Sequence, residues 1–268
     1  MSIHPTAIVS DQASIGNDVE IGAYAIIDGP AVIGDGCQIA AHVQILGSTQ
    51  LAEGNRIGPA AIIGGLPQDL SFDPSTVSHV SLGAHNDIRE HVTIHRSATA
   101  GETTVLGEKN FLMAGVHLGH DCQVGNHNII ANNALLGGHV EIGDGAFIGG
   151  GSVVHQFVRI GDRVMTQGNS GFSLDLPPFV IGFEINRIAG LNVIGLRRAG
   201  FSKEARAEIK ELFRLFYRAR LTKRAATDQA VGQPWGEDAR ALLDFLTAPS
   251  KKGVCLRMKA SAGESQSQ

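Results

Sequence analysis

The sequence carries one aliphatic residue at every sixth position, and this spacing is its strongest constraint on the fold. In steps of six from Ile3 to Ile63, eleven successive positions hold Ile, Val or Leu. An amphipathic helix needs apolar residues three and four apart, so the pattern argues against a helix. It is typical of hexapeptide repeats, in which short strands and tight turns form three-sided coils of eighteen residues. Coils stacked like the strands of a sheet predict a rod-shaped, mainly β protein.

The repeat is interrupted once and then ends. Ile63 and Leu82 are nineteen residues apart, one more than a multiple of six, and two prolines lie between them. We therefore expect an excursion from the solenoid at about 64–81. The pattern weakens over 97–104 (SATAGETT), returns at Leu106 and holds to Phe172. The segment LPPF at 176–179 is expected to close the repeat, because proline cannot continue a β-ladder.

The sequence after residue 180 has a different pattern. Ser202 is a candidate N-cap, and the apolar residues from Ala205 to Tyr217 follow helical spacing. A second helix is expected at Glu237 to Thr247, and the terminal SAGESQSQ is expected to be disordered. The predicted organisation is a hexapeptide-repeat β-helix over 1–180, followed by a C-terminal helical domain with a disordered tail over 181–268.

Composition limits the function classes. The formal net charge is only −4, so no nucleic-acid partner is expected. The cysteines are scattered and odd in number (Cys37, Cys122 and Cys255), which indicates reduced thiols rather than a disulfide framework. No run of eighteen apolar residues and no signal-peptide pattern is present. We therefore expect a cytoplasmic protein without membrane insertion.

Histidines concentrate in one zone of the repeat. Nine of the eleven lie between His79 and His155. Residues eighteen apart stack in neighbouring coils, so His120 is expected over Gly138, beside His139. His155 falls over position 137 by the same rule. The sequence therefore predicts a cluster of histidines on neighbouring coils.

Three functional interpretations fit this cluster. His120 could be a general base whose tautomer Asp121 fixes, while the backbone N–H groups of glycines 137 and 138 stabilise an oxyanion. This arrangement suits acyl transfer without a protein nucleophile. Alternatively, zinc could bind to histidines, although H-x-x-H on an extended strand is poor ligand spacing; a γ-carbonic-anhydrase-like enzyme has this chemistry. The four histidines of that alternative are His117, His120, His139 and His155. A purely structural or binding solenoid is the third interpretation.

Several motifs resemble one enzyme family across most of the chain. They are LMAGVHLGHDCQVGNHNIIANNALLGGHVEIGD at 112–144, GGGSVVHQFVRIG at 149–161, PQDL at 67–70, IREHVTIHR at 88–96, PPFVIG at 177–182 and GLNVIGLRRAGFS at 190–202. Together they resemble the acyl-[acyl-carrier-protein]–UDP-N-acetylglucosamine O-acyltransferases, which start lipid A synthesis.

The resemblance implies a left-handed parallel β-helix, a homotrimer with active sites between subunits, and no cofactor or metal. The implied substrates are a 3-hydroxyacyl group on acyl carrier protein and a UDP-sugar, UDP-N-acetylglucosamine. His120 matches the general base that deprotonates the sugar 3-hydroxyl, Asp121 the residue that orients it, and Gly138 the oxyanion donor. The implied substrate-binding residues are Gln68, Asp69, His117, His139, His155, Gln156, Asn192, Arg197 and Arg198.

Met165 and Gly168 match the acyl-chain site, where glycine leaves room for a long chain. Three positions depart from the family pattern: Ser71 replaces a usual Lys, Ile194 a frequent acid and Ala199 a second Arg, for which Arg197 could compensate. These changes affect the nucleotide-sugar end. They leave open an N-acyltransferase that acts on a 3-amino sugar or another activated sugar.

Overall fold

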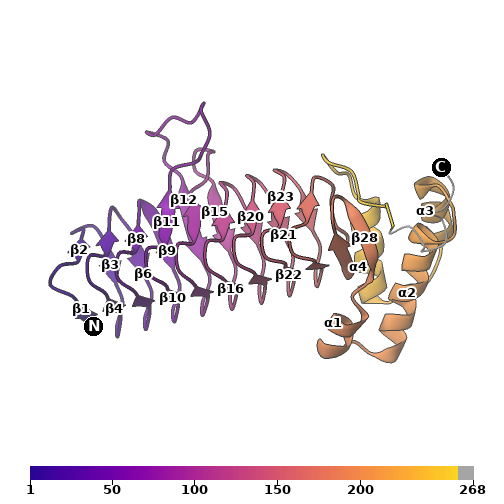
Figure 1. The fold of residues 1–268 in the computed structure, drawn as a ribbon, viewed down its shortest axis with the longest axis horizontal. Coiled ribbons are helices and arrows are strands. Elements are labelled where there is room, and N and C mark those ends of the chain that lie inside the picture. Colours follow the sequence, from indigo (N-terminus) through magenta and orange to yellow (C-terminus); the bar gives the residue numbers. More distant parts are fainter. Residues whose placement is uncertain (259–268) are drawn as a thin grey trace.

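Three parallel sheets run along a rod in the computed structural model, which describes residues 1–258 (Figure 1). The first sheet contains β1 (Ser2–Ile3), β4 (Glu20–Ile21), β7 (Gln38–Ile39), β10 (Arg56–Ile57), β13 (Asp87–Ile88), β16 (Phe111–Leu112), β19 (Ile129–Ile130), β22 (Phe147–Ile148), β25 (Met165–Thr166), β27 (Val180–Phe183) and β28 (Arg187–Leu191). The second contains β2 (Ile8–Val9), β5 (Ile26–Ile27), β8 (Gln44–Ile45), β11 (Ile62–Gly65), β14 (Thr93–His95), β17 (His117–Leu118), β20 (Leu135–Leu136), β23 (Val153–Val154) and β26 (Gly171–Phe172). The third contains β3 (Ser14–Ile15), β6 (Val32–Ile33), β9 (Ser48–Leu51), β12 (His79–Leu82), β15 (Thr103–Leu106), β18 (Gln123–Val124), β21 (Glu141–Ile142) and β24 (Arg159–Ile160).

The chain visits the three sheets in turn, so each strand pairs with the strand one coil later. Leu118 pairs with Leu136 and Leu136 with Val154, an eighteen-residue register. The second residue of a two-residue strand points inward, and Ile130, Leu136 and Ile142 are at most 3% exposed. The fold is the predicted left-handed parallel β-helix, with the six-residue aliphatic positions forming its core.

Two insertions interrupt the coils. Ile57 pairs with Ile88, thirty-one residues on, and the extra chain projects from the rod between β11 and β12 (Figure 1). This excursion spans 66–78, shorter than the expected 64–81, because Ile62–Gly65 and His79–Leu82 are paired strands. The second insertion, a loop at 96–102, was not predicted. It adds six residues, which leaves the six-residue pattern in phase.

The β-structure does not close at LPPF. Strand β27 pairs in parallel with β25, and β28 then pairs antiparallel with β27. The two prolines lie in the turn before β27, where the ladder needs no N–H from them. Residues 180–191 therefore belong to the first sheet, and the helical region begins beyond the expected boundary at 180.

Four helices occupy one end of the rod within the described residues: α1 (Val193–Arg198), α2 (Lys203–Tyr217), α3 (Lys223–Val231) and α4 (Glu237–Thr247) (Figure 1). The expected helices correspond to α2 and α4, and Ser202 Oγ accepts a hydrogen bond from the Ala205 N–H at 3.0 Å. The short helices α1 and α3 were not predicted. The tail expected to be disordered lies outside the described residues. None of these helices has the length and hydrophobicity that a bilayer crossing requires.

Candidate active site

The candidate site lies at the corner between the second and third sheets. His120 and Asp121 form the turn after β17, and His139 and Phe157 occupy the same corner on the next two coils. Asp121, His139 and Phe157 have φ values of 61°, 58° and 67°, the left-handed conformation of this turn. The rings form a column: His139 stacks on Phe157 with centroids 4.5 Å apart, and the His120 ring lies edge-on to His139 at 5.2 Å.

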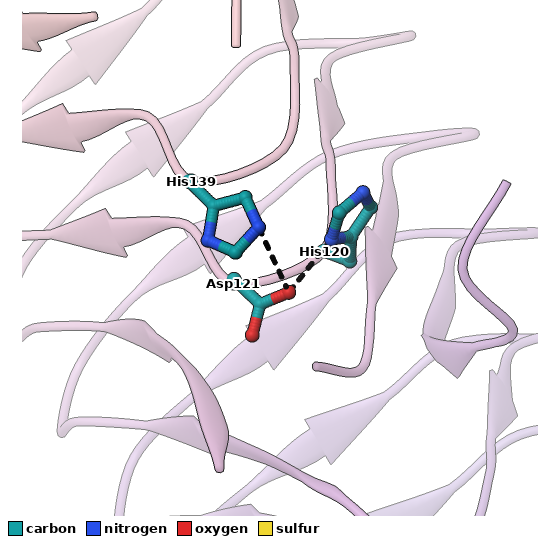
Figure 2. A group of neighbouring side chains, drawn as sticks. All are labelled: His120, Asp121 and His139. Carbon is teal, nitrogen blue, oxygen red and sulfur yellow. Dashed lines mark hydrogen bonds and ion pairs between the residues drawn. The ribbon is translucent and has the colours of Figure 1, made fainter. Parts of the chain in front are cut away.

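The carboxylate of Asp121 lies between the two histidines (Figure 2). Its Oδ2 is 2.7 Å from His120 Nδ1 and 3.7 Å from His139 Nε2. An ionised carboxylate only accepts hydrogen bonds, so the short contact places the proton on His120 Nδ1. The lone pair of the neutral ring is then on His120 Nε2, as the general-base interpretation requires.

The unpredicted loop at 96–102 contacts the same carboxylate. The Ser97 hydroxyl donates to Asp121 Oδ1, and the Ala98 N–H donates to Oδ2 at 3.1 Å. Burial alone raises the pKa of Asp121, but the hydrogen bonds from Ser97, His120 and Ala98 outweigh it and hold this pKa below the usual value. Asp121 is therefore ionised near neutral pH. The weakened repeat over SATAGETT was the one sequence signal for these two residues.

Gly138 lies directly against the His120 ring. A Cβ at this position would be 2.5 Å from His120 Nε2, so a side chain would displace the ring. Within the described residues the Gly138 N–H donates no hydrogen bond, whereas its carbonyl accepts from the Phe157 N–H at 3.0 Å. The N–H is therefore available to an oxyanion beside His120.

Two further histidines pack beside this corner on the second sheet. His117 Nδ1 is 2.7 Å from Thr93 Oγ1, and the His95 ring meets the His117 ring edge-on at 4.7 Å. Burial lowers the pKa of His95 to about 4 and that of His117 below its usual value. Both rings are therefore neutral at pH 7. The pKa of His139 is also lowered by burial, although the charge of Asp121 opposes that effect.

The excursion at 66–78 carries Gln68 and Asp69, the residues predicted to contact the sugar. Asp69 accepts hydrogen bonds from the N–H and hydroxyl of Ser71, both at 2.8 Å, and these lower its pKa. The Ser71 hydrogen bonds are the main cause of this lowering, with a smaller electrostatic contribution from His120. Gln68 is exposed on this loop, and His155 and Gln156 are exposed on the coil beyond Gly138.

One chain does not bring every predicted residue together. The Asn192 side chain caps α1, accepting from the Gly195 N–H and donating to the Arg163 carbonyl, both at 3.0 Å. Arg197 and Arg198 are exposed in the last turn of α1. Figure 1 shows α1 at the helical end of the rod, away from the two coils that contain β16 and β20. The predicted nucleotide-binding residues are thus separated from His120.

The predicted acyl-chain residues lie at another corner. Met165 points outward from the first sheet and is 38% exposed. Gly168 follows it at the turn between the first and second sheets, where a Cβ would be 3.0 Å from the Gly150 carbonyl oxygen. His120, in contrast, follows the second sheet. In one chain the acyl-chain residues and the candidate base therefore occupy different edges of the prism.

The structure brings together fewer potential metal ligands than the metal-binding alternative requires. Among the described residues, His120, Asp121 and His139 have potential ligand atoms within 4.8 Å of one another. His117 and His155, the other members of the predicted four-histidine set, are not in this group. The shortest contact inside it is the 2.7 Å hydrogen bond from His120 Nδ1 to Asp121 Oδ2.

A cavity of about 550 Å³ opens behind the corner, on the side of the third sheet. Asp121, His139 and Phe157 line one side of it, and residues 249–251 cover another. The Lys251 ammonium lies 4.5 Å from the centre of the Phe157 ring. The C-terminal segment thus packs against the column of rings that contains the candidate base.

The parallel β-helix and its histidine corner define the hexapeptide-repeat class of acyltransferases. Family profiles agree: "Bacterial transferase hexapeptide (six repeats)" matches 103–138, and "Hexapeptide repeat of succinyl-transferase" matches 12–46 and 139–170. The profile "Udp N-acetylglucosamine O-acyltransferase; Domain 2" matches 175–255.

Individual relatives identify the family. The acyl-[acyl-carrier-protein]–UDP-N-acetylglucosamine O-acyltransferase of Paraburkholderia phymatum is 47% identical over 260 residues, covering 94% of this chain and 98% of the relative. The solved UDP-N-acetylglucosamine acyltransferase of Bacteroides fragilis is 37% identical with a TM-score of 0.88, covering 94% of this chain and 99% of that one. The Francisella novicida structure is 30% identical with a TM-score of 0.90, at 97% and 95% coverage. The chain belongs to this acyltransferase family, which confirms the resemblance.

Proposed function

We propose that the chain transfers a 3-hydroxyacyl group from acyl carrier protein to the 3-hydroxyl of UDP-N-acetylglucosamine, the first step of lipid A synthesis. The observation that carries the proposal is the 2.7 Å hydrogen bond from His120 Nδ1 to a half-buried, ionised Asp121. It fixes Nε2 as the ring nitrogen of His120 that can accept a proton, beside the Gly138 N–H, which has no acceptor within the described residues. The chain that carries this pair belongs to this acyltransferase family.

The proposed mechanism uses the groups at this corner. His120 Nε2 takes the proton of the sugar 3-hydroxyl as its oxygen attacks the thioester carbonyl carbon. The Gly138 N–H stabilises the oxyanion that forms. The C–S bond then breaks, and the departing thiolate takes the proton from His120. Cys122 is an unsuitable nucleophile because burial raises its pKa to about 12.

We further propose that the chain acts as a homotrimer whose sites lie between subunits. Several outward positions of the first and second sheets near the site are apolar and exposed, in contrast to the polar outward positions of the third sheet in the same coils. These exposed positions are Ile129, Leu135, Val153 and Met165, between 38% and 49% exposed. Exposed apolar side chains that gather on neighbouring strands are typical of surfaces that bind another protein. A neighbouring subunit would cover it and could contribute the residues of α1 and the acyl-chain corner that one chain keeps away from His120.

The acceptor atom and the location stay predictions. Ser71 stands where the family usually has lysine, and its hydroxyl is engaged by Asp69 at 2.8 Å. A 3-amino sugar remains the second candidate acceptor for this reason. The cytoplasmic location also stays a prediction, consistent with three free, buried cysteines.

The test incubates purified protein with a pool of 3-hydroxyacyl carrier proteins and either UDP-N-acetylglucosamine or its 3-amino analogue. Mass spectrometry then identifies the product and its chain length. We expect an O-acylated sugar carrying a long chain. His120→Ala should lower the rate about 10²–10⁴-fold, whereas His127→Ala, at a different corner, should retain it. Product from the amino analogue alone would favour N-acylation. Near-full activity of His120→Ala would contradict the mechanism.

A further inference from the structure

We propose that Ser97 is a positioning residue for acyl transfer, as the outer member of a hydrogen-bond chain from Ser97 through Asp121 to His120. This inference rests on the proposed function, because it assigns a role in the same site. Ser97 acts through Asp121 and does not touch the reacting atoms. It comes from the inserted loop at 96–102, which the hexapeptide pattern alone does not reveal.

The hydrogen bonds of Ser97 orient its hydroxyl toward the carboxylate. Ser97 is fully buried, and its Oγ accepts the Thr99 N–H at 3.0 Å. Its single proton can therefore go to Asp121 Oδ1 or, at 3.2 Å, to the Thr99 carbonyl. The contact to Asp121 is the shorter, and its acceptor is charged. A charge-assisted hydrogen bond is about twice as strong as a neutral one, so the proton belongs on the Asp121 side.

Donors on both sides hold the Asp121 carboxylate in place. Ser97 binds Oδ1, while Ala98 and His120 both bind Oδ2. Without the Ser97 hydroxyl, Asp121 Oδ1 loses its donor, and only the two contacts to Oδ2 still oppose rotation of the carboxylate about its Cβ–Cγ bond. Rotation would lengthen the bond to His120 Nδ1, the contact that fixes the tautomer and direction of the base.

The loop at 96–102 is itself held in place by contacts with the excursion at 66–78. Ser78 Oγ donates to the Ser97 carbonyl at 2.5 Å. The Arg96 guanidinium donates to the carbonyls of Thr76 and Pro74 and lies over the Phe72 ring, 5.2 Å from its centre. The position of Ser97 is therefore tied to the same segment that carries Asp69. This connection makes the loop a rigid support for Asp121.

The kinetic test compares Ser97→Ala with Ser78→Ala. Both variants remove a buried hydroxyl, Ser78 from the excursion and Ser97 from the loop, but only Ser97 contacts Asp121. We expect Ser97→Ala to lower kcat about ten- to a hundredfold, the effect of one hydrogen bond to a charged group, with acceptor KM changed less than about twofold. Ser78→Ala should stay much closer to the parent protein. Equal losses in the two variants would assign the effect to the loop as a whole and overturn the proposal.

A double-mutant cycle asks whether Ser97 acts through Asp121. In an Asp121→Ala background, the additional change Ser97→Ala should alter kcat less than about twofold. A merely structural role would produce the same loss in both backgrounds. Thermal unfolding of all variants checks that they remain folded.

A turnover-independent measurement separates this inference from the proposed function. The His120 Nδ1 proton, bound to a carboxylate, should give a downfield imidazole proton signal by NMR. The signal should disappear in His120→Ala and Asp121→Ala and should shift or broaden in Ser97→Ala. If the parent protein is inactive, the proposed reaction is refuted, but the NMR measurement can still test the contact between Ser97 and Asp121. A signal unchanged in Ser97→Ala would refute the role of Ser97.

Discussion

At the scale of single residues, the candidate base depends on a glycine as much as on a carboxylate. The His120 ring occupies space that any side chain at position 138 would fill. We therefore expect Gly138→Ala to displace the ring and lower kcat about a hundredfold, the size of effect that a misplacement of about 1 Å produces. Gly232→Ala, which adds a Cβ with nothing within 4 Å, is the matched control. Equal activity of the two variants would contradict the packing argument.

His95 predicts a pH dependence of stability. Its pKa is lowered by burial to about 4 in the folded protein, against 6.5 for an unburied ring. The unfolded chain therefore binds this proton first, and stability falls as pH decreases from about 6.5 to 4. The shift corresponds to about 3 kcal/mol. His95→Phe removes the titrating group. As pH decreases over this range, the free energy of unfolding of the variant should therefore fall by about 3 kcal/mol less than that of the parent protein.

Urea unfolding from pH 7 to 4, at one protein concentration, measures the effect. His95 Nδ1 has no hydrogen-bond partner within the described residues, so the phenyl ring leaves no new polar group unpaired at that site. Parallel curves for the parent protein and His95→Phe would show that His95 is not the group responsible.

At the scale of elements, a ladder of buried asparagines joins the coils at one corner. Asn110 donates from its backbone and side chain to Asn86 Oδ1 at 2.8 and 3.0 Å, and its own Oδ1 accepts the Asn128 N–H at 2.8 Å. Asn110→Ala leaves that N–H buried without a partner and should cost about 2–3 kcal/mol of unfolding free energy. Asn126→Ala should cost less than about 1 kcal/mol, because water can replace its partly exposed contacts. Thermal and urea unfolding compare the two.

At the scale of the whole molecule, the proposed trimer should depend on the apolar outward faces. Leu135→Glu places a carboxylate on the exposed second-sheet face. Burial of an unpaired charge between subunits costs several kcal/mol, which corresponds to about a thousandfold weaker association. Light scattering should then report the mass of one chain, with activity lost.

Gln123 is exposed on strand β18 of the third sheet. The variant Gln123→Glu is therefore the control for this prediction and should leave the assembly intact. A parent protein that is monomeric and active would refute the trimer. A trimeric Leu135→Glu variant would show that the second-sheet face lies outside the interface.

The sequence by itself determined the repeating part of the fold. A single aliphatic residue every six positions fits coils of three short strands that each turn one residue inward, so the core residues follow from the spacing. Adjacent residues such as His120 and Asp121 are also local, and helix spacing after Ser202 predicts α2 without tertiary information. These features depend on neighbours in sequence or on a fixed register.

Tertiary structure alone decided the features that break this register or join distant segments. An insertion of six residues leaves a six-residue pattern in phase, and the weakened pattern over 97–104 does not say where the loop goes, so Ser97 could not be placed beside Asp121 from the sequence. The turn at LPPF lets β27 continue the sheet, although proline predicted an end. His139 reaches the Asp121 carboxylate whereas His155 is exposed, because a corner turns successive side chains in different directions. Local spacing specifies a coil, but contacts between coils depend on the complete path of the chain.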